Sequence, residues 1–305
     1  MADLPELGAP GDLQTVARAG EPCRLARGLD QTGLVDEEMA ERAAVISSEF
    51  ARRARSLGAV NTVIGATAAL RRATNGGNVA ERVGERAGIQ VRILTGEEEA
   101  RLVYQAVISG LGGGAGRSAC IVFDLGGGST EIVSGLGQEA GRWVSLPLGA
   151  VNLTERFIRS DPVGQSEIDS LEREVEAILM HECAYMPESA PVFAGVGGSV
   201  TVLASLDRGV STYDPALIEG WHIKADRLED LAYRVAHSTT EVREGWPVLG
   251  RGRSDIVVAG ALVIRLLARR FRSSGLVCST HGLRYGLARL AAYGQAGRDG
   301  TPSSH

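Results

Sequence analysis

The sequence predicts an α/β protein of two domains, because strand-like and helix-like stretches alternate along it and glycine-rich turns occur in both halves. Its 305 residues favour two domains over one, and a hydrophobic content of 44% is enough for a sizeable core. The glycine-rich stretch 110–116 follows a helical pattern and is interpreted as the linker. We therefore expect a first domain over residues 1–115, a second over 116–291, and a disordered tail rich in Gly, Ser and Pro over 292–305. The sequence does not assign the last helix to one domain: it can belong to the second domain or pack back on the first.

Elements of the first domain follow from hydrophobic periodicity. A strand-like stretch covers residues 13–25, and apolar residues recur at helical spacing over residues 36–57. Further strands are expected at 60–64 and 89–94, with a short helix after Asn75 between them. Thr95 then opens another helix, with Glu98 three residues later in the pattern of a capping box.

Elements of the second domain begin with a hairpin over residues 121–136. A strand is expected at 191–194, followed by a glycine turn and a helix that starts near Val200. Three longer helices are expected near 165–180, 225–237 and 253–271.

The turn of that hairpin has the composition of a phosphate and metal site. Asp124 and Glu131 flank three glycines, Gly126, Gly127 and Gly128, and two hydroxyls, Ser129 and Thr130. Glycine lets backbone N–H groups approach anionic oxygens, and carboxylates are the hard oxygen ligands that Mg²⁺ prefers. Glycine runs also form ordinary tight turns, but the flanking carboxylates and hydroxyls favour phosphate. The segment matches neither a Walker loop nor a dinucleotide fingerprint, because it lacks Gly-Lys-Ser/Thr and no helix follows it.

A second glycine turn, Gly195-Val-Gly197-Gly198-Ser199, lies between a strand and a helix. This order aims helix N–H groups at an anion. Close backbone packing would explain the glycines equally well on their own. Two such turns in one domain favour a phosphate-binding cleft.

Charge and targeting signals narrow the function classes. A net charge of −5 argues against bulk binding to nucleic acid or to an anionic membrane. Only Lys224 is lysine among the 32 basic residues, and arginine forks suit phosphate, so Arg71, Arg72 and Arg101 are candidates. No stretch is long and apolar enough to span a membrane, and no secretory signal is present, so cytoplasmic location is expected. The four scattered cysteines are expected to be reduced structural thiols.

Six segments of the chain form a recognisable set of motifs in their order and spacing: Ala66 to Asn75, Thr95 to Leu102, Asp124 to Glu131, Leu146 to Val151, Gly195 to Ser199 and His281 to Gly286. Together they resemble the exopolyphosphatase and guanosine pentaphosphate phosphohydrolase (Ppx/GppA) family. The resemblance runs from about Leu13 to Leu290 and implies the actin-like fold of the acetate kinase, sugar kinase and Hsp70 group, with two ribonuclease-H-like domains around a cleft.

The resemblance also implies an activity and a set of roles. It implies release of terminal phosphate from inorganic polyphosphate or guanosine pentaphosphate by water, with Mg²⁺ or Mn²⁺, and a homodimer is usual in the family. Glu99 corresponds to the catalytic base, whereas Glu97 and Glu98 are interpreted as first-turn acids that stabilise the helix dipole. Asp124 and Glu131 correspond to metal ligands. The corresponding phosphate-binding residues are Gly126, Gly127, Gly128, Ser129, Thr130, Gly197, Gly198, Ser199 and Arg71.

One departure from the family pattern lies at the N-terminus. Where the family has a strand and a first phosphate-binding turn, this sequence has Met-Ala-Asp-Leu-Pro-Glu-Leu-Gly-Ala-Pro, whose prolines do not suit a central strand. Either the start is placed too far downstream, or this is a decayed or repurposed homologue, and the expectation is low activity. A non-catalytic binder of alarmones or polyphosphate is the rival hypothesis. An actin-like sugar kinase is disfavoured because no acceptor motif is present.

Overall fold

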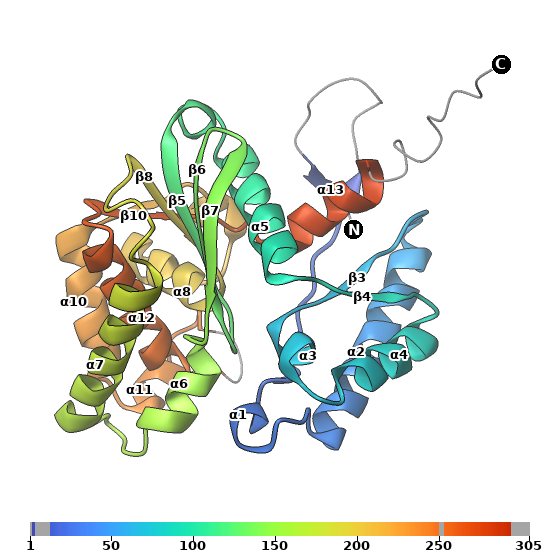
Figure 1. Cartoon of the computed structure of the whole chain (residues 1–305), viewed down its shortest axis with the longest axis horizontal. Coiled ribbons are helices and arrows are strands. Elements are labelled where there is room, and N and C mark those ends of the chain that lie inside the picture. The colour runs from blue at the N-terminus through green and yellow to red at the C-terminus, as the bar shows by residue number, and fades with distance from the viewer. Residues whose placement is uncertain (1, 4–12, 250–252, 294–305) are drawn as a thin grey trace. The chain divides into compact units, whose positions relative to one another are not determined.

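The computed structural model describes residues 2–3, 13–249 and 253–293 (Figure 1). It divides into two compact units, one with the described residues up to Thr95 and those from Leu283 onward, the other running from Gly96 to Gly282. The division therefore falls at Thr95 and not near residue 115. The reason is that helix α5 (Gly96–Leu111), placed by the sequence in the first domain, packs on strands of the second unit.

The described residues of the first unit form two small sheets and, before Thr95, four helices. Strands β1 (Ala2–Asp3) and β2 (Gln14–Thr15) pair antiparallel, and β3 (Ile64–Ala66) pairs in parallel with β4 (Val91–Ile93). The helices are α1 (Leu29–Thr32), α2 (Glu37–Ser56), α3 (Ala68–Arg72) and α4 (Gly76–Ala87). The expected helices at 36–57 and after Asn75 are thus confirmed, and Asp36 caps α2 by accepting hydrogen bonds from two backbone N–H groups, at 2.9 and 3.2 Å.

Two strand predictions in this unit need correction. Of the stretch 13–25, only Gln14–Thr15 is strand. Gly20 and Pro22 interrupt the rest, because glycine weakens a strand and proline lacks the N–H that a ladder needs. The strand expected at 60–64 begins instead at Ile64, and Val60 is 94% exposed.

The second unit is built on a six-stranded mixed sheet in the order β7-β6-β5-β8-β10-β9. Strand β5 pairs antiparallel with β6 and in parallel with β8, which pairs in parallel with β10. The hairpin that the sequence predicts therefore places β5 among the central strands, with β6 between it and the edge strand β7. The strands are β5 (Ala119–Leu125), β6 (Thr130–Leu136), β7 (Glu139–Leu146), β8 (Val192–Val196), β9 (His222–Lys224) and β10 (Gly275–Cys278).

The helices of this unit include the ones that the sequence predicts. The expected helices are observed as α7 (Gln165–Glu182), α8 (Gly198–Arg208), α10 (Ala225–Ala236) and α12 (Val257–Arg270). Four further elements were not predicted from the sequence: α6 (Ala150–Phe157), α9 (Pro215–Ile218), α11 (Thr240–Glu244) and the 3₁₀ turn η1 (Ala115–Arg117). The expected linker 110–116 is therefore the end of α5 and a turn into η1, inside the second unit.

The C-terminal helix α13 (Leu283–Tyr293) belongs to the first unit. Its Leu287 side chain packs on Gly65 of β3, where a Cβ would be 2.7 Å away, and the Tyr285 hydroxyl lies 3.0 Å from Thr15 Oγ1. Ala292 and Tyr293, placed in the expected tail, continue this helix, and the rest of that tail lies outside the described residues.

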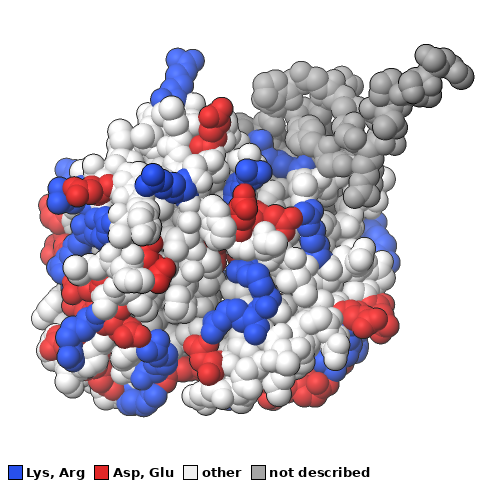
Figure 2. All heavy atoms as spheres, viewed as in Figure 1, with Lys and Arg blue, Asp and Glu red and all other residues white. Residues whose placement is uncertain are grey.

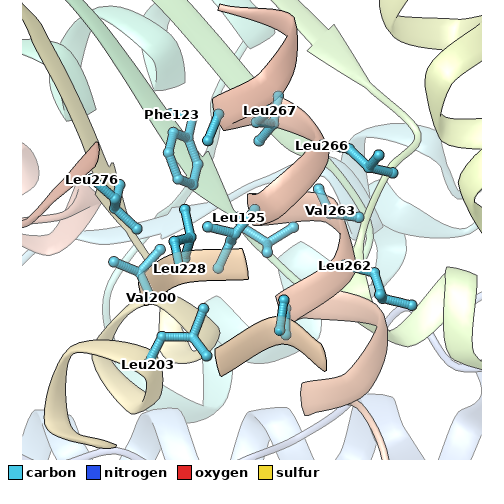
Figure 3. Close-up of a cluster of buried hydrophobic side chains, with 14 of the residues drawn as sticks. Phe123, Leu125, Val200, Leu203, Leu228, Leu262, Val263, Leu266, Leu267 and Leu276 are labelled. Carbon is cyan, nitrogen blue, oxygen red and sulfur yellow. The ribbon is translucent and has the colours of Figure 1, made fainter. Parts of the chain in front are cut away.

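The core of the second unit lies between the sheet and the helices on one of its faces. Figure 3 shows side chains of β5 meeting those of α12, with α8, α10 and β10 alongside. Phe123 reaches over Gly195 of β8, where any Cβ would be 2.4 Å from the ring. The labelled residues, all buried, are Phe123, Leu125, Val200, Leu203, Leu228, Leu262, Val263, Leu266, Leu267 and Leu276.

All four cysteines are free thiols, as the scattered spacing predicts. Cys120, Cys183 and Cys278 are buried and Cys23 is partly buried. Burial raises the pKa of Cys183 to about 11, because the thiolate would lose its hydration.

Candidate phosphate-binding site

The two predicted glycine turns lie side by side at one edge of the sheet. Each follows the carboxyl end of a strand, and these strands, β5 and β8, are parallel neighbours with Asp124 opposite Val196. Gly197 has a φ of +113°, and a Cβ there would lie 2.4 Å from the Leu125 carbonyl oxygen. Only glycine allows this approach, so the backbones of the two turns come into direct contact. Ligands of open α/β sheets bind at this kind of edge.

Helix α6 holds the first turn from one side. The Ala150 and Val151 N–H groups donate to the Gly126 and Gly127 carbonyls at 3.0 and 2.9 Å, and the Asn152 side-chain amide donates to the Gly128 carbonyl at 3.1 Å. The turn's carbonyls are thereby directed at α6. Among the described residues, the hydrogen bonds of this turn include none donated by the Gly127 or Gly128 N–H groups, so these N–H groups are candidates to bind a ligand.

A pocket of about 260 Å³ opens between the two turns. Among the described residues of its lining, Arg253 is the basic one, and its guanidinium lies on Gly198, where a Cβ would be 2.5 Å from Nη1. The remaining wall is largely aliphatic. The lining residues are Leu125, Gly126, Gly127, Ala150, Gly197, Gly198, Ser199, Val202, Leu249, Arg253, Ile256 and Val257.

The sequence reasoning missed Arg253. The residue lies just before α12, in a chain where nearly every basic residue is arginine, so its type carries no signal. The predicted Ser199 does line the pocket, but its hydroxyl also lies against α12, where a Cβ on Gly260 would be 2.0 Å from Oγ.

The two predicted metal ligands are direct cross-strand neighbours. Asp124 of β5 pairs with Glu131 of β6, which puts both carboxylates on the same face of the sheet. Glu131 is 2% exposed and accepts a hydrogen bond of 2.7 Å from the Ser145 hydroxyl of β7, while Asp124 is half-buried. Thr130, whose side chain points to the opposite face, donates to the Leu148 carbonyl at 2.7 Å and supports the turn.

Helix α5 covers the face that carries these carboxylates. Cys120 and Gly135 lie on the same face, and Tyr104 of α5 lies against Gly135. Its hydroxyl would be 2.4 Å from a Cβ on Gly135, and it donates to the Gly137 carbonyl at 3.0 Å. The helix lies beside β6 and β7 in Figure 1.

The predicted base, Glu99, is on the buried stripe of α5. It is 5% exposed and shares this stripe with Val103 one turn on. Gly96, one turn earlier, lies against the sheet, where a Cβ would be 3.8 Å from the Cβ of Ser145. Because Ser145 also binds Glu131, the first turn of α5 brings Glu99 to the part of the sheet that holds Glu131 and Asp124.

The arginines proposed from the sequence have other partners. Arg71 belongs to the first unit, where its Nη1 donates to the Leu94 carbonyl at 2.8 Å, and its role toward phosphate stays a prediction. Arg72 pairs with Asp30, and Arg101 is exposed at 3.9 Å from Glu97.

The donor set fits a magnesium site that substrate completes. Among the residues that the structure describes, no group of three or more His, Cys, Asp or Glu is arranged to hold an ion. Mg²⁺ commonly binds through one or two carboxylates together with substrate phosphates and water. Asp124 and Glu131, adjacent on one face beside a phosphate-type turn, meet that requirement.

Residues 7–290 match the Ppx/GppA phosphatase family. The chain belongs to this family. Exopolyphosphatase 2 of Mycobacterium tuberculosis is 30% identical over 298 residues, which cover 94% of this chain and 92% of that protein. A solved Ppx/GppA family member from Aquifex aeolicus is 27% identical with a TM-score of 0.78, covering 96% and 93% of the two chains. A solved exopolyphosphatase-like protein is 26% identical with a TM-score of 0.87, covering 94% and 92%.

Family membership confirms two predictions. The fold is the actin-like α/β fold, and the chain is a hydrolase of phosphoanhydride bonds. Figure 2 shows basic and acidic side chains interspersed over the visible face, in keeping with the small net charge of −5. None of the helices in the described residues has the length and hydropathy needed to cross a bilayer.

Proposed function

We propose that this Ppx/GppA family member removes terminal phosphate from inorganic polyphosphate, with Glu99 as general base and Mg²⁺ at Asp124 and Glu131. The observation that carries the proposal is the pair of glycine turns at the ends of parallel β5 and β8, beside a sheet face that carries Asp124 and Glu131 and is covered by the helix of Glu99. The similarity to exopolyphosphatase 2 supports the choice of substrate.

Each group has a task in this reaction. The N–H groups of Gly127 and Gly128 and the guanidinium of Arg253 bind phosphate oxygens, and these charge-assisted hydrogen bonds fix the chain end. Glu99 accepts a proton from a water molecule as the oxygen of that water bonds to the terminal phosphorus. The bridging P–O bond then breaks, and the shortened chain keeps that oxygen. Mg²⁺, when bound, neutralises charge on the phosphate oxygens.

A substitution pair tests the base. Glu99→Gln keeps the shape of the side chain but cannot accept the proton, so phosphate release from polyphosphate should fall about 10²- to 10⁴-fold. Glu97→Gln is the matched control, because Glu97 is in the same helical turn with its side chain 60% exposed, and its rate should be unchanged. An unchanged rate in Glu99→Gln would sink the assignment. Ligand binding without turnover in the wild type would indicate a binder and not an enzyme.

The metal assignment has its own test. Asp124→Asn and Glu131→Gln each remove a charged oxygen ligand, so half-maximal activity should require at least about tenfold more Mg²⁺. Chelation should abolish the wild-type rate and added Mg²⁺ should restore it. Glu139→Gln, an exposed residue of β7, is the control. Identical Mg²⁺ titrations for all four proteins would contradict the assignment.

The aliphatic wall of the pocket favours a second candidate, guanosine pentaphosphate. Polyphosphate has no apolar part, whereas a nucleotide base can cover Val202, Leu249 and Ile256. If the nucleotide is the substrate, its kcat/KM should exceed that of tripolyphosphate, and Leu249→Ala should lower it for the nucleotide alone. Equal effects of Leu249→Ala on both substrates would reject this candidate.

A further inference from the structure

We infer that Arg243 of α11 is a positioning residue that fixes the backbone beside Arg253 and so holds the Arg253 guanidinium in the phosphate pocket. The inference rests on the proposed function. It concerns residues that do not line the pocket themselves.

Arg243 is an arginine enclosed by backbone and polar side chains. It is 2% exposed, and its Nε donates to the Ser254 carbonyl at 2.7 Å. Its Nη1 donates to the Ser238 carbonyl and its Nη2 to the Thr240 hydroxyl at 2.9 Å. Asp161 lies 3.5 Å from Nη2. The planar fork of arginine therefore ties three chain segments together, which lysine could not do with one ammonium group.

The bond to Ser254 matters most because Ser254 directly follows Arg253. The Arg253 carbonyl accepts from the Val257 N–H at 3.1 Å, and the next carbonyl, that of Ser254, accepts from Arg243. Two consecutive peptide groups are thus fixed, one by α12 and one by Arg243. Arg253 leaves this fixed backbone toward Gly198, where its guanidinium lines the pocket.

Asp161 anchors Arg243 in turn. Its two carboxylate oxygens accept from the Thr240 N–H at 2.8 and 3.1 Å, at the start of α11, and its charge faces the guanidinium. Burial lowers the pKa of Arg243, and the charges of Asp161 and Asp255 act against this lowering. Removing one partner of a buried ion pair destabilises a fold, because the other charge is left unpaired. Loss of Arg243 therefore costs stability, and it also frees the backbone at residue 254.

A double-mutant cycle tests the inference, with inorganic tripolyphosphate and Mg²⁺ as the substrate. Arg253→Met removes the phosphate contact and should raise KM about 10- to 100-fold, the equivalent of a charged hydrogen bond. Arg243→Met should raise KM by about 5- to 20-fold and leave kcat within about twofold, since the base is untouched. The double variant should be no worse than Arg253→Met alone, because Arg243 acts through Arg253.

Two further variants separate positioning from general destabilisation. Asp161→Asn is milder, since an amide oxygen still accepts from Thr240. It should raise KM about two- to fivefold, and only when Arg253 is present. Arg265→Met removes another partly buried arginine, 12% exposed and paired with Glu172, away from the pocket lining. It should lower the melting temperature without changing KM.

Three results would overturn the inference. The first is an unchanged KM in folded Arg243→Met and Asp161→Asn. The second is a double variant whose rise in KM is the product of the rises in Arg243→Met and Arg253→Met, and the third is a rise of KM in Arg265→Met equal to that in Arg243→Met. If the wild type does not hydrolyse tripolyphosphate, the proposed activity on polyphosphate fails separately. The same variants are then compared by the Kd of tripolyphosphate, measured by calorimetry. A double variant that binds no more weakly than Arg253→Met alone supports the positioning role, and no binding by the wild type overturns it.

Discussion

At the residue scale, the site depends on glycines whose missing side chains leave room for other groups. A Cβ on Gly197 would meet the Leu125 carbonyl, which is rigid backbone, whereas a Cβ on Gly198 would meet the end of the Arg253 side chain, which can move. Substitutions at these neighbouring positions should therefore differ in kind. One should strain the turn, and the other should displace a ligand-binding group.

Gly198→Ala should raise KM for polyphosphate about tenfold while the free energy of unfolding changes by less than about 1 kcal/mol, because the guanidinium moves away and the backbone stays. Steady-state kinetics and thermal unfolding measure the two effects. Gly77→Ala, at a helical glycine of α4 with open space around it, is the control and should leave KM unchanged. A Gly198→Ala enzyme with normal KM would mean that Arg253 does not bind the substrate.

At the element scale, α6 acts as a support for the first turn. The first N–H groups of α6 donate to carbonyls of the turn, and the side chain of Asn152, which is 2% exposed, donates to the Gly128 carbonyl. Helix N-termini usually bind anions directly, but here the turn's carbonyls occupy these donors. The helix therefore acts indirectly, by directing the opposite side of the turn's peptide groups to the ligand.

Asn152→Ala should lower both stability and activity. The Gly128 carbonyl loses its donor, at a cost of about 1 to 3 kcal/mol for an unpaired buried group, and the turn loosens. Thr154→Ala is the matched control. It removes a side-chain hydrogen bond of 2.7 Å in the same helix, from the Thr154 hydroxyl to the Ala150 carbonyl, and this bond does not involve the turn. Chemical denaturation and phosphate release should show a loss of activity for Asn152→Ala alone. Equal losses in both variants would contradict the role of α6.

At the scale of the whole molecule, the described chain forms two units whose chain connections lie at Thr95–Gly96 and Gly282–Leu283. The three fully buried cysteines, Cys120, Cys183 and Cys278, all belong to the second unit, and Cys23 belongs to the first. Thiol reactivity therefore reports on each unit separately.

With a thiol reagent at pH 8, Cys23 should react first, and the three second-unit thiols should react only as that unit unfolds. The thiolate is the reactive form, and burial raises the pKa of Cys183 to about 11, so its reactivity should increase as pH rises toward that value. Cys23→Ser should abolish the early reaction. Rapid labelling of several thiols in the native protein would show that the second unit opens locally.

The sequence predicted most elements of the second unit and few strand limits of the first. Helices such as α7 and α10 have long amphipathic patterns, which are local and strong. The strands β3 and β4 are only three residues long, and Gly20 and Pro22 break the stretch before them, so their limits depend on packing. The domain boundary was misplaced because a glycine-rich stretch looks like a linker wherever a turn follows a helix.

What the sequence by itself determined is the family, together with the candidate residues of the site: the glycine turns and the carboxylates Asp124 and Glu131. These features are encoded within short segments, where residue type and local spacing suffice. Only the tertiary structure showed that α5 covers the carboxylate face, that Arg253 lines the pocket, and that Arg243 binds the carbonyl of the next residue, Ser254. Those contacts join segments far apart in the chain, and the parallel pairing of β5 with β8 brings the two turns together. No local pattern specifies that pairing, because it depends on how the whole core closes.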